Sequence, residues 1–328
     1  MIPQRILGRT ELTVSALGLG TTEIGYVYGI GDRNMPSEKE AINLLHRAVD
    51  LGITFIDTGH FYGAAEERIG ASGIAKRDSI IVSTKCGHVL DRGEDITEEE
   101  LASQFRNEVE QSLKKLHLES IPLVQVHGGS AEQIRSGLIS GIMNTLKAEG
   151  KLQYFGISTR GTEAPLAAIE DGNFDTLQLA ASILDQRMYN TVFAEAYKHN
   201  IGIINRSVLL KGALTPARTS LAPSLKPLVS NADAAEDIAK KLGTTLPSLA
   251  IRFAFSQPEV STVLVGSNKV KNLEVAAAAI ADGPLHEEVL QQLRKLAIDD
   301  PLQVDPKNWD TQYVADAKDG KKVHANTK

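Results

Sequence analysis

The chain has 328 residues, of which 42% are hydrophobic and 23% are charged, and its formal net charge is -6. These values are typical of a globular protein, and charges of both signs scattered along the chain favour neither a nucleic-acid partner nor an anionic membrane. The single cysteine, Cys86, excludes an intrachain disulfide and favours a reducing compartment. We find no apolar run of membrane-spanning length and no signal peptide, so we expect a cytoplasmic protein.

The N-terminal segment, residues 4–14, has the pattern of a small hairpin. A strand-then-helix alternation follows to about residue 281. Between the expected strands lie helix-length segments with an apolar stripe, and Gly52, Gly150 and Gly243 stand where a glycine commonly follows a helix. The eight expected strands are Ala16–Thr22, Thr54–Gly59, Ile80–Cys86, Leu123–Gly128, Tyr154–Thr159, Thr176–Ser182, Gly202–Ser207 and Thr262–Ser267.

Eight alternating units with nearly continuous apolar strands predict a parallel sheet that is covered by helices and closed as a (β/α)₈ TIM barrel. An open doubly wound sheet is the alternative, and its dinucleotide fingerprint is Gly-x-Gly-x-x-Gly after a strand. The segment that comes nearest to it is Gly18-Leu19-Gly20, where Glu23 takes the place of the third glycine. We therefore expect one barrel domain over residues 1–328.

Three segments are additional to the strands, helices and short connections of a minimal barrel. Tyr26–Ser37 and Thr215–Leu228 are expected to be long loops after the first and seventh strands, and a C-terminal tail begins at about Gly283. The polar run from residue 318 to residue 328 is expected to be mobile. Long loops at the catalytic face of a barrel commonly control substrate access.

Polar side chains stand at the ends of three consecutive predicted strands. Asp57 ends one strand and Tyr62 follows it in the loop, while Lys85 and His127 end the next two strands. The carboxyl ends of barrel strands carry the active site. A phenol beside an ammonium, with an acid and an imidazole nearby, suits reversible proton transfer to a carbonyl or alcohol oxygen.

Each of these residues alone has a commoner structural role, such as helix capping, an ion pair or packing. Their shared position at strand ends favours the catalytic interpretation. Acyl transfer is not indicated, because no Gly-x-Ser-x-Gly motif occurs. A metal site built from His60, Cys86, His88 and His127 is also not expected, because Cys86-Gly87-His88 is not a usual ligand spacing.

The chain resembles the aldo-keto reductases over nearly its whole length. The resemblance rests on several motifs in the same order along the chain, and within it Ser83–Gly87 and Val263–Gly266 are similar to the sugar-dehydrogenase branch. The motifs begin in Leu7–Thr21 and continue through Phe55–Gly63, Ser83–Lys85, the strand that ends in His127, Gly150–Ser158, Arg206–Leu214 and Val265–Glu274.

This resemblance implies a barrel that binds NAD(P)H without a Rossmann domain. It implies that Tyr62 is the general acid and base, that Lys85 lowers its pKa, that Asp57 pairs with Lys85, and that His127 orients the carbonyl. It also implies a set of residues along the cofactor: Gly20, Thr21, Ser158, Gln178, Arg206, Ser207, Leu209, Gly212, Gly266, Ser267, Lys269 and Lys271.

The region expected around the 2′-phosphate of NADP departs from the family pattern. Gly266 stands where a basic residue is common, and Asn272 stands at the usual arginine position. Lys269 and Lys271 can still supply positive charge at the start of a helix, although surface exposure is the ordinary state of a lysine. NADP is the expected cofactor because it is commoner in the family, with NAD as the alternative.

The substrate is expected to be a small carbonyl compound or a sugar. Tyr28 and Trp309 are candidate pocket walls, and His60 and His88 are candidate contacts to a polyhydroxy substrate. One alternative is an aldose 1-dehydrogenase that forms a lactone with NAD. Alternatives from other classes are a cofactor-binding regulatory subunit on the same fold and a non-redox barrel enzyme. A monomer is the default expectation.

Overall fold

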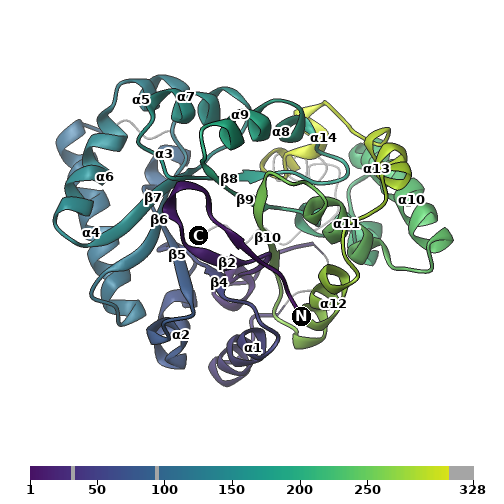
Figure 1. The fold of residues 1–328 in the computed structure, drawn as a ribbon, viewed down its shortest axis with the longest axis horizontal. Coiled ribbons are helices and arrows are strands. Elements are labelled where there is room, and N and C mark those ends of the chain that lie inside the picture. Colours follow the sequence, from purple (N-terminus) through teal and green to yellow (C-terminus); the bar gives the residue numbers. More distant parts are fainter. Residues whose placement is uncertain (31–33, 93–95, 310–328) are drawn as a thin grey trace, which may run out of the picture.

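The computed structural model describes residues 1–30, 34–92 and 96–309, and within them it contains the expected barrel. Its strands run parallel in the closed order β10-β3-β4-β5-β6-β7-β8-β9 (Figure 1). All eight predicted strands are confirmed, with no bound shifted by more than two residues. The strands are β3 (Leu17–Gly20), β4 (Phe55–Asp57), β5 (Ile81–Cys86), β6 (Ile121–His127), β7 (Leu152–Ser158), β8 (Thr176–Ala180), β9 (Gly202–Arg206) and β10 (Val260–Gly266).

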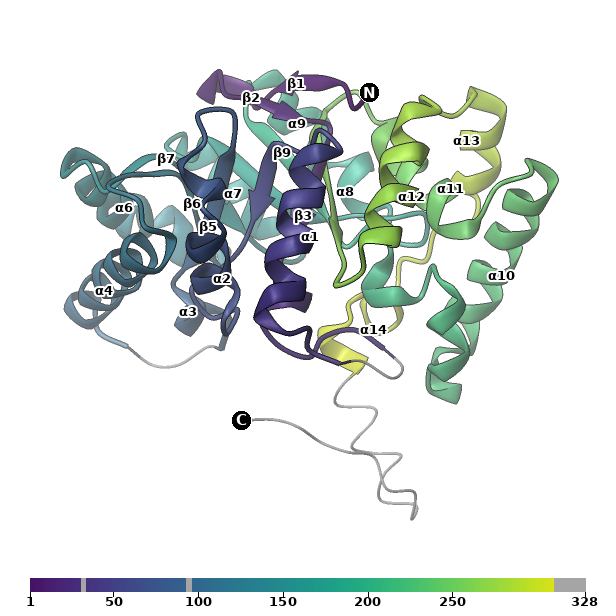
Figure 2. The same cartoon turned by 90° about the horizontal axis from the view of Figure 1, so that it is seen from below.

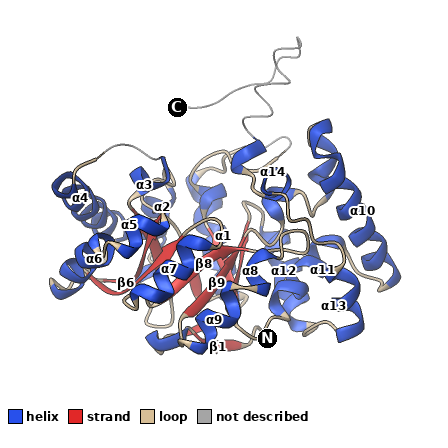
Figure 3. Ribbon diagram, turned by 90° about the horizontal axis from the view of Figure 1, so that it is seen from above, coloured by secondary structure: helices blue, strands red, loops and turns tan. Residues whose placement is uncertain are grey.

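Helices surround these strands on the outside (Figure 3). They form because their apolar residues recur at helical spacing and bury one face, as Leu44, Leu45 and Ala48 do. The helices are α1 (Glu38–Asp50), α2 (Ala65–Ser72), α3 (His88–Arg92), α4 (Glu98–Leu116), α5 (Ala131–Arg135), α6 (Leu138–Ala148), α7 (Glu163–Asp171), α8 (Arg187–Asn190), α9 (Val192–Lys198), α10 (Lys226–Lys241), α11 (Leu246–Phe255), α12 (Val270–Ala281), α13 (Glu287–Arg294) and α14 (Pro301–Val304).

Local signals define the helix ends. Helix α1 begins at a capping box in which the Ser37 side chain accepts from the Glu40 backbone N–H, and Glu40 accepts from the Ser37 backbone. Helices α1, α6 and α10 are followed by the three predicted glycines, all with positive φ (Gly52 at 90°, Gly150 at 75° and Gly243 at 65°). These angles confirm the glycine signals, because side chains of L-residues disfavour this conformation.

The predicted hairpin closes the amino-terminal end of the barrel. Strands β1 (Gln4–Ile6) and β2 (Thr13–Ser15) pair antiparallel, and Leu7 and Val14 pack into one cluster with the barrel residues Phe55, Leu123 and Ile204. Figure 2 shows the hairpin at one end of the barrel and α14 toward the other. The end that receives the βα loops is therefore left for a functional site.

A second hydrophobic cluster lies beside the barrel and joins α10, α11, α13 and α14 to Trp309. It corrects the expectation of a long loop over Thr215–Leu228. That segment forms two 3₁₀ helices, Pro216–Ser220 and Pro223–Leu225, and then enters α10. Proline suits the first position of a helix, since it lacks an N–H and its φ is already helical. The run 318–328 lies outside the described residues. Within the described ranges no helix has the length and apolar character needed to cross a bilayer.

Candidate active site

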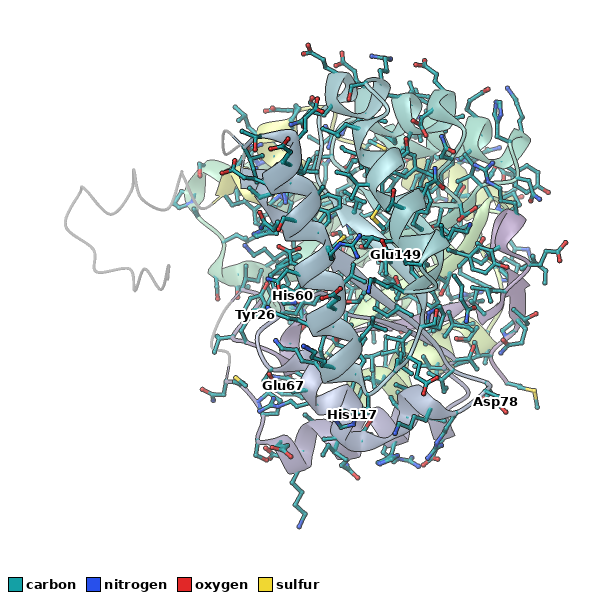
Figure 4. All side chains as sticks on the ribbon, turned by 90° about the vertical axis from the view of Figure 1, so that its left-hand side faces the viewer. Tyr26, His60, Glu67, Asp78, His117 and Glu149 are labelled. Atoms are coloured by element: carbon teal, nitrogen blue, oxygen red, sulfur yellow. The ribbon has the colours of Figure 1, made fainter. Side chains whose placement is uncertain are left out.

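A cavity of about 360 Å³ opens at the carboxyl-terminal ends of the strands. Figure 4 shows Tyr26 and His60, which follow β3 and β4, toward one end of the barrel and Asp78, which precedes β5, toward the other. Three of the four expected catalytic residues, Asp57, Tyr62 and His127, line the cavity together. The structure therefore brings together groups that are up to 70 positions apart in the sequence, as the strand-end argument predicted.

Lys85 is fully buried next to the cavity, and its ammonium donates to the last residue of β4 and to the residue after it. The Lys85 Nζ donates to Asp57 Oδ2 at 2.6 Å and to the Thr58 carbonyl oxygen at 2.7 Å. The second carboxylate oxygen of Asp57 accepts from Gln178 Nε2 at 2.6 Å. The acid and the amine thus form the ion pair expected from the sequence, and Gln178 supports it from the opposite side of the barrel.

Burial and pairing act in opposite directions on the two charged groups. Desolvation raises the pKa of the Asp57 carboxyl and lowers the pKa of the Lys85 ammonium. The attraction between the two groups opposes both pKa shifts, as does the hydrogen bond that joins them. Each charge is retained in the barrel because the other lies within hydrogen-bonding distance.

Tyr62 is held in a tight turn after β4. Its backbone N–H donates to the Gly59 carbonyl oxygen at 2.9 Å, and Gly63 follows with φ of 53°. Gly25 lies directly against this turn, since a Cβ there would stand 1.8 Å from the Tyr62 carbonyl oxygen. The Lys85 Nζ lies 4.8 Å from the centre of the Tyr62 ring. The amine and the phenol are therefore neighbours across the ring face.

Burial and nearby charges set the pKa of Tyr62. Burial raises the pKa of the Tyr62 phenol above its ordinary value, and the negative charge of Asp57 raises this pKa further. A hydrogen bond with Thr22 and the positive charges of Arg206 and Arg160 lower it only in part. The phenol thus stays protonated, while two donors of Lys85 are directed to Asp57 and the Thr58 carbonyl.

His127, the last residue of β6, is held in its neutral form. Desolvation lowers its pKa to about 2, and the positive charges of Lys85 and Arg206 contribute to the shift. Its Nδ1 lies 3.2 Å from Nδ1 of His88. Because Nδ1 is engaged by a second imidazole, Nε2 is the ring nitrogen of His127 that remains for a ligand in the cavity.

Most of the residues expected along the cofactor line the same cavity. Two of them offer polar atoms without a partner, since Ser158 Oγ and Arg206 Nε are buried and form no hydrogen bond. The other nitrogens of Arg206 donate to the Thr159 carbonyl and to Ser207 Oγ. The expected cofactor residues in the cavity wall are Gly20, Ser158, Gln178, Arg206, Ser207, Leu209, Gly212 and Gly266.

Backbone strain is concentrated in the segment after β9. Three non-glycine residues there, Ser207, Leu210 and Lys211, have φ of 60°, 46° and 54°. Each such conformation costs on the order of 1–3 kcal/mol and tends to occur at binding sites. Ser207 and Lys211 line the cavity. The strain therefore makes this segment a candidate for ligand contact.

Four expected cofactor residues do not line the cavity. Thr21 is buried, and its hydroxyl donates to the Asp57 carbonyl oxygen at 2.9 Å. Ser267 Oγ accepts from the Lys269 backbone N–H at 3.0 Å and from Asn272 Nδ2 at 3.0 Å. The side chains of Lys269 and Lys271 are exposed outside the cavity, whereas Asn272 contributes to its wall.

The four substrate candidates divide into two groups. Tyr28 and His88 line the cavity. His60 is directed to Glu66, with 3.8 Å between its Nδ1 and Glu66 Oε2, and is absent from the wall. Trp309 is 1% exposed in the second hydrophobic cluster, and its Nε1 donates to the Gln303 carbonyl oxygen. The expectation that Trp309 forms a pocket wall is therefore wrong, since packing and this hydrogen bond keep it in the core.

Several residues of the cavity wall were not predicted individually. Tyr26 and Phe61 bring aromatic rings beside Tyr62, with ring centres 6.3 and 4.8 Å from the Tyr62 ring. Arg160 follows Ser158 by two positions, a spacing that identifies it as a further strand-end residue. The other members of the wall that sequence reasoning missed include Thr22, Glu23, Val208, Lys211, Thr215, Leu264, Val265 and Asn272.

Comparison with known proteins agrees with this arrangement. A model of the aldo/keto reductase family matches residues 16–298. The chain is 28% identical over 305 residues to the uncharacterized oxidoreductase YqkF of Bacillus subtilis (strain 168), covering 89% of this chain and 95% of that protein. It is 29% identical over 297 residues to L-galactose dehydrogenase of Arabidopsis thaliana, covering 86% and 89%.

The fold is shared with a solved structure as well. The holo form of an aldo-keto reductase from Bacillus halodurans superposes with a TM-score of 0.76 at 23% identity, covering 92% of this chain and 98% of that one. The family match spans the barrel and every strand end that contributes to the cavity. The chain therefore belongs to the aldo/keto reductase family and is an oxidoreductase.

Proposed function

We propose that this enzyme interconverts a carbonyl and an alcohol with a nicotinamide dinucleotide, and that Tyr62 is the general acid and base. One observation carries the proposal. Tyr62 and the neutral His127 face the same cavity, and the buried Asp57–Lys85 ion pair lies directly behind Tyr62. A proton donor and a neutral hydrogen-bond donor that meet at one point suit a carbonyl oxygen that gains negative charge.

The cavity offers groups that fit the cofactor. Ser158 Oγ and Arg206 Nε are buried polar atoms that lack a partner, and a bound carboxamide or phosphate can satisfy them. Gly20 and Gly266 bring bare backbone to the cavity wall. We propose that these four residues and the strained segment after β9 hold a nicotinamide dinucleotide. When bound, it supplies the hydride to the carbonyl carbon, or accepts it in the reverse direction.

The chain itself handles the proton. Tyr62 is protonated at neutral pH, as a phenol ordinarily is, and burial raises its pKa further. It can therefore give its proton to a substrate oxygen that becomes an alkoxide. In the reverse direction it takes the proton from the alcohol. Lys85 then stabilises the phenolate, because Asp57 and Thr58 occupy only two of its three N–H donors among the described residues.

His127 positions the oxygen that reacts. Its low pKa keeps it neutral, so His127 does not compete with Tyr62 as the proton donor. Its Nε2 is available to the substrate because Nδ1 is engaged by His88. A hydrogen bond donated from Nε2 stabilises negative charge on the carbonyl oxygen as the hydride arrives.

We propose a sugar or another small hydroxy-carbonyl compound as the substrate. The cavity wall carries charged and polar groups beyond the catalytic ones, including Glu23, Arg160 and Lys211, which suit a ligand with several hydroxyl groups. Similarity to L-galactose dehydrogenase supports the same substrate class. For an aldose, oxidation at the hemiacetal carbon would give a lactone.

We further propose that NAD(H) is preferred, although NADP(H) was the expectation from the sequence. Lys269 and Lys271 are exposed outside the cavity, while the uncharged Asn272 and Gly266 line it. Phosphate recognition favours arginine or lysine in direct contact with the ligand. A wall without a cation at these two positions favours the cofactor that lacks the 2′-phosphate.

The test combines binding and turnover. NADH and NADPH are titrated separately against the purified protein, and nicotinamide absorbance is then followed with a panel of aldoses and small aldehydes. We expect tighter binding of NADH, turnover of at least one aldose, and a loss of about 10²–10⁴-fold in kcat in Tyr62→Phe with unchanged cofactor affinity. Tyr26→Phe, a phenol in the same wall, is the matched control and should retain kcat. Binding of neither cofactor would refute the proposal.

A further inference from the structure

The mechanism described above leaves unexplained why a second imidazole contacts His127. His88 and His127 face each other through Nδ1 atoms that are 3.2 Å apart. Both rings line the cavity, and their planes are tilted by 54°. His88 is the first residue of α3, which follows β5, and His127 ends β6, 39 positions further along the chain.

Two independent contacts fix the position of His88. The Gly87 backbone N–H donates to the buried carboxylate of Glu108 at 2.6 Å, so α3 begins at a defined place. Gly87 has φ of 78°, and a Cβ on it would lie 2.5 Å from the Phe105 ring. The conformation and the space both require glycine there. The core of the protein therefore places His88, the next residue, beside His127.

Phe61 fixes the orientation of the His88 ring. The two rings are stacked, with centres 4.1 Å apart and planes at 11°. Phe61 also meets His127 edge to face at 4.7 Å and Tyr62 at 4.8 Å. One aromatic side chain thus packs against both histidines and the phenol. Such packing limits the rotation of each ring about its own axis.

The contact between the two nitrogens must hold a single proton. If both Nδ1 atoms carried hydrogen the protons would collide, and if neither did the lone pairs would repel. When the proton belongs to His88, His127 accepts at Nδ1 and carries its own proton on Nε2. When the proton belongs to His127, its Nε2 has only a lone pair and cannot donate to a carbonyl oxygen.

We propose that His88 is a positioning residue that donates from Nδ1 to His127 and thereby keeps the His127 proton on Nε2, facing the substrate oxygen. This inference rests on the proposed function, because it assigns the direction of the hydrogen bond that His127 makes there. A hydrogen-bonding partner of this kind fixes both the tautomer and the ring orientation of a histidine. The low pKa of His127 agrees with a ring that carries one proton.

The first test locates the proton between the two Nδ1 atoms directly and needs no turnover. Protein labelled with ¹⁵N-histidine is studied by NMR at neutral pH, and the eight histidines are assigned with single variants. We expect a proton bonded to His88 Nδ1, a coupling across the hydrogen bond to His127 Nδ1, and a protonated His127 Nε2. A proton bonded to His127 Nδ1 would overturn the proposal, whatever the activity of the enzyme.

Two variants then separate positioning from packing. His88→Phe keeps a flat ring against Phe61 but removes the donor, and His88→Asn retains an amide N–H close to the Nδ1 position. We expect kcat/KM to fall by up to about 10²-fold in His88→Phe, the effect of a misdirected donor to a developing oxyanion. His88→Asn should recover most of this loss, and NADH affinity should stay unchanged in both variants.

The outcomes distinguish the two proposals. Wild-type kcat/KM in His88→Phe, or equal losses in both variants, would show that His88 acts only through packing. If the wild-type protein turns over no carbonyl substrate at all, the proposed function fails, while the NMR result still decides which histidine carries the shared proton.

Discussion

The buried Asp57–Lys85 pair gives a sharp test of the structure, because the losses from its two single substitutions should add up to more than the loss from the double substitution. Lys85→Met keeps the aliphatic stem but leaves Asp57 Oδ2 without its 2.6 Å donor. Asp57→Asn leaves an ammonium that is 0% exposed beside neutral oxygen acceptors only, without its counter-charge. Breaking a buried pair on one side costs about 3–5 kcal/mol.

The expected loss can be expressed as a melting temperature. A chain of 328 residues has an unfolding entropy of about 0.7 kcal/mol per kelvin near 60 °C. A loss of about 3–5 kcal/mol therefore lowers Tm by about 4–7 °C in each single variant. In the double variant Lys85→Met/Asp57→Asn no uncompensated charge remains, so the loss should be at least about 2 kcal/mol smaller than the sum of the two single losses.

Urea unfolding at pH 7, followed by circular dichroism and by the fluorescence of the single tryptophan, measures these losses. The matched control is the exposed pair Arg135–Glu170, whose atoms are 2.9 Å apart and whose side chains are 53% and 59% exposed. Arg135→Met should leave the free energy of unfolding close to the wild-type value, because exposed ion pairs contribute little to stability. If Lys85→Met and Asp57→Asn cost as little as this control, the reasoning about a buried ion pair is refuted.

Further predictions concern residues at the edge of the site. Trp309→Ala should lower the free energy of unfolding by about 3–5 kcal/mol through lost burial, with KM unchanged, and a raised KM at wild-type Tm would restore the pocket-wall interpretation. Tyr28→Ala should give the opposite result, a higher KM for the substrate with unchanged Tm, because its ring lines the cavity and is partly exposed; equal KM values would contradict this. The pKa of His127 is about 2 in the fold and about 6.5 unfolded, so the unfolded chain binds one more proton between these values. The contribution of His127 to the free energy of unfolding should therefore be fully present above pH 6.5 and fall by up to about 1.4 kcal/mol per pH unit below it. In His127→Gln the free energy of unfolding should fall less steeply with decreasing pH, and parallel curves for the two proteins would refute this.

The barrel could be predicted because its signals are local and repeated. Apolar strands alternate with amphipathic helices, and each of the glycines Gly52, Gly150 and Gly243 ends a helix with positive φ. Parallel strands also place their carboxyl ends at one edge. The positions of Asp57, Tyr62 and His127 around one cavity, with Lys85 buried beside it, therefore followed from the order of the strands.

The direction of side chains in loops could not be predicted in the same way. His60 and Phe61 are adjacent in sequence, yet Phe61 lines the cavity and His60 is directed to Glu66. No periodicity fixes which side a loop residue faces, because this depends on the tight turn around Tyr62 and on Gly25 packed against it. Lys269 and Lys271 likewise carry the expected charge but have side chains outside the cavity.

The closed barrel, its hairpin and the acid, phenol, amine and imidazole at the strand ends could be predicted from the chain alone, since period and strand order are properties of the sequence. Three-dimensional packing was needed to place Trp309 in the core, to direct the donors of Lys85 to Asp57 and Thr58, and to bring His88 to His127. These arrangements depend on distances between elements far apart in the chain, which packing sets when Glu108, Gly87 and Phe61 hold their neighbours in place.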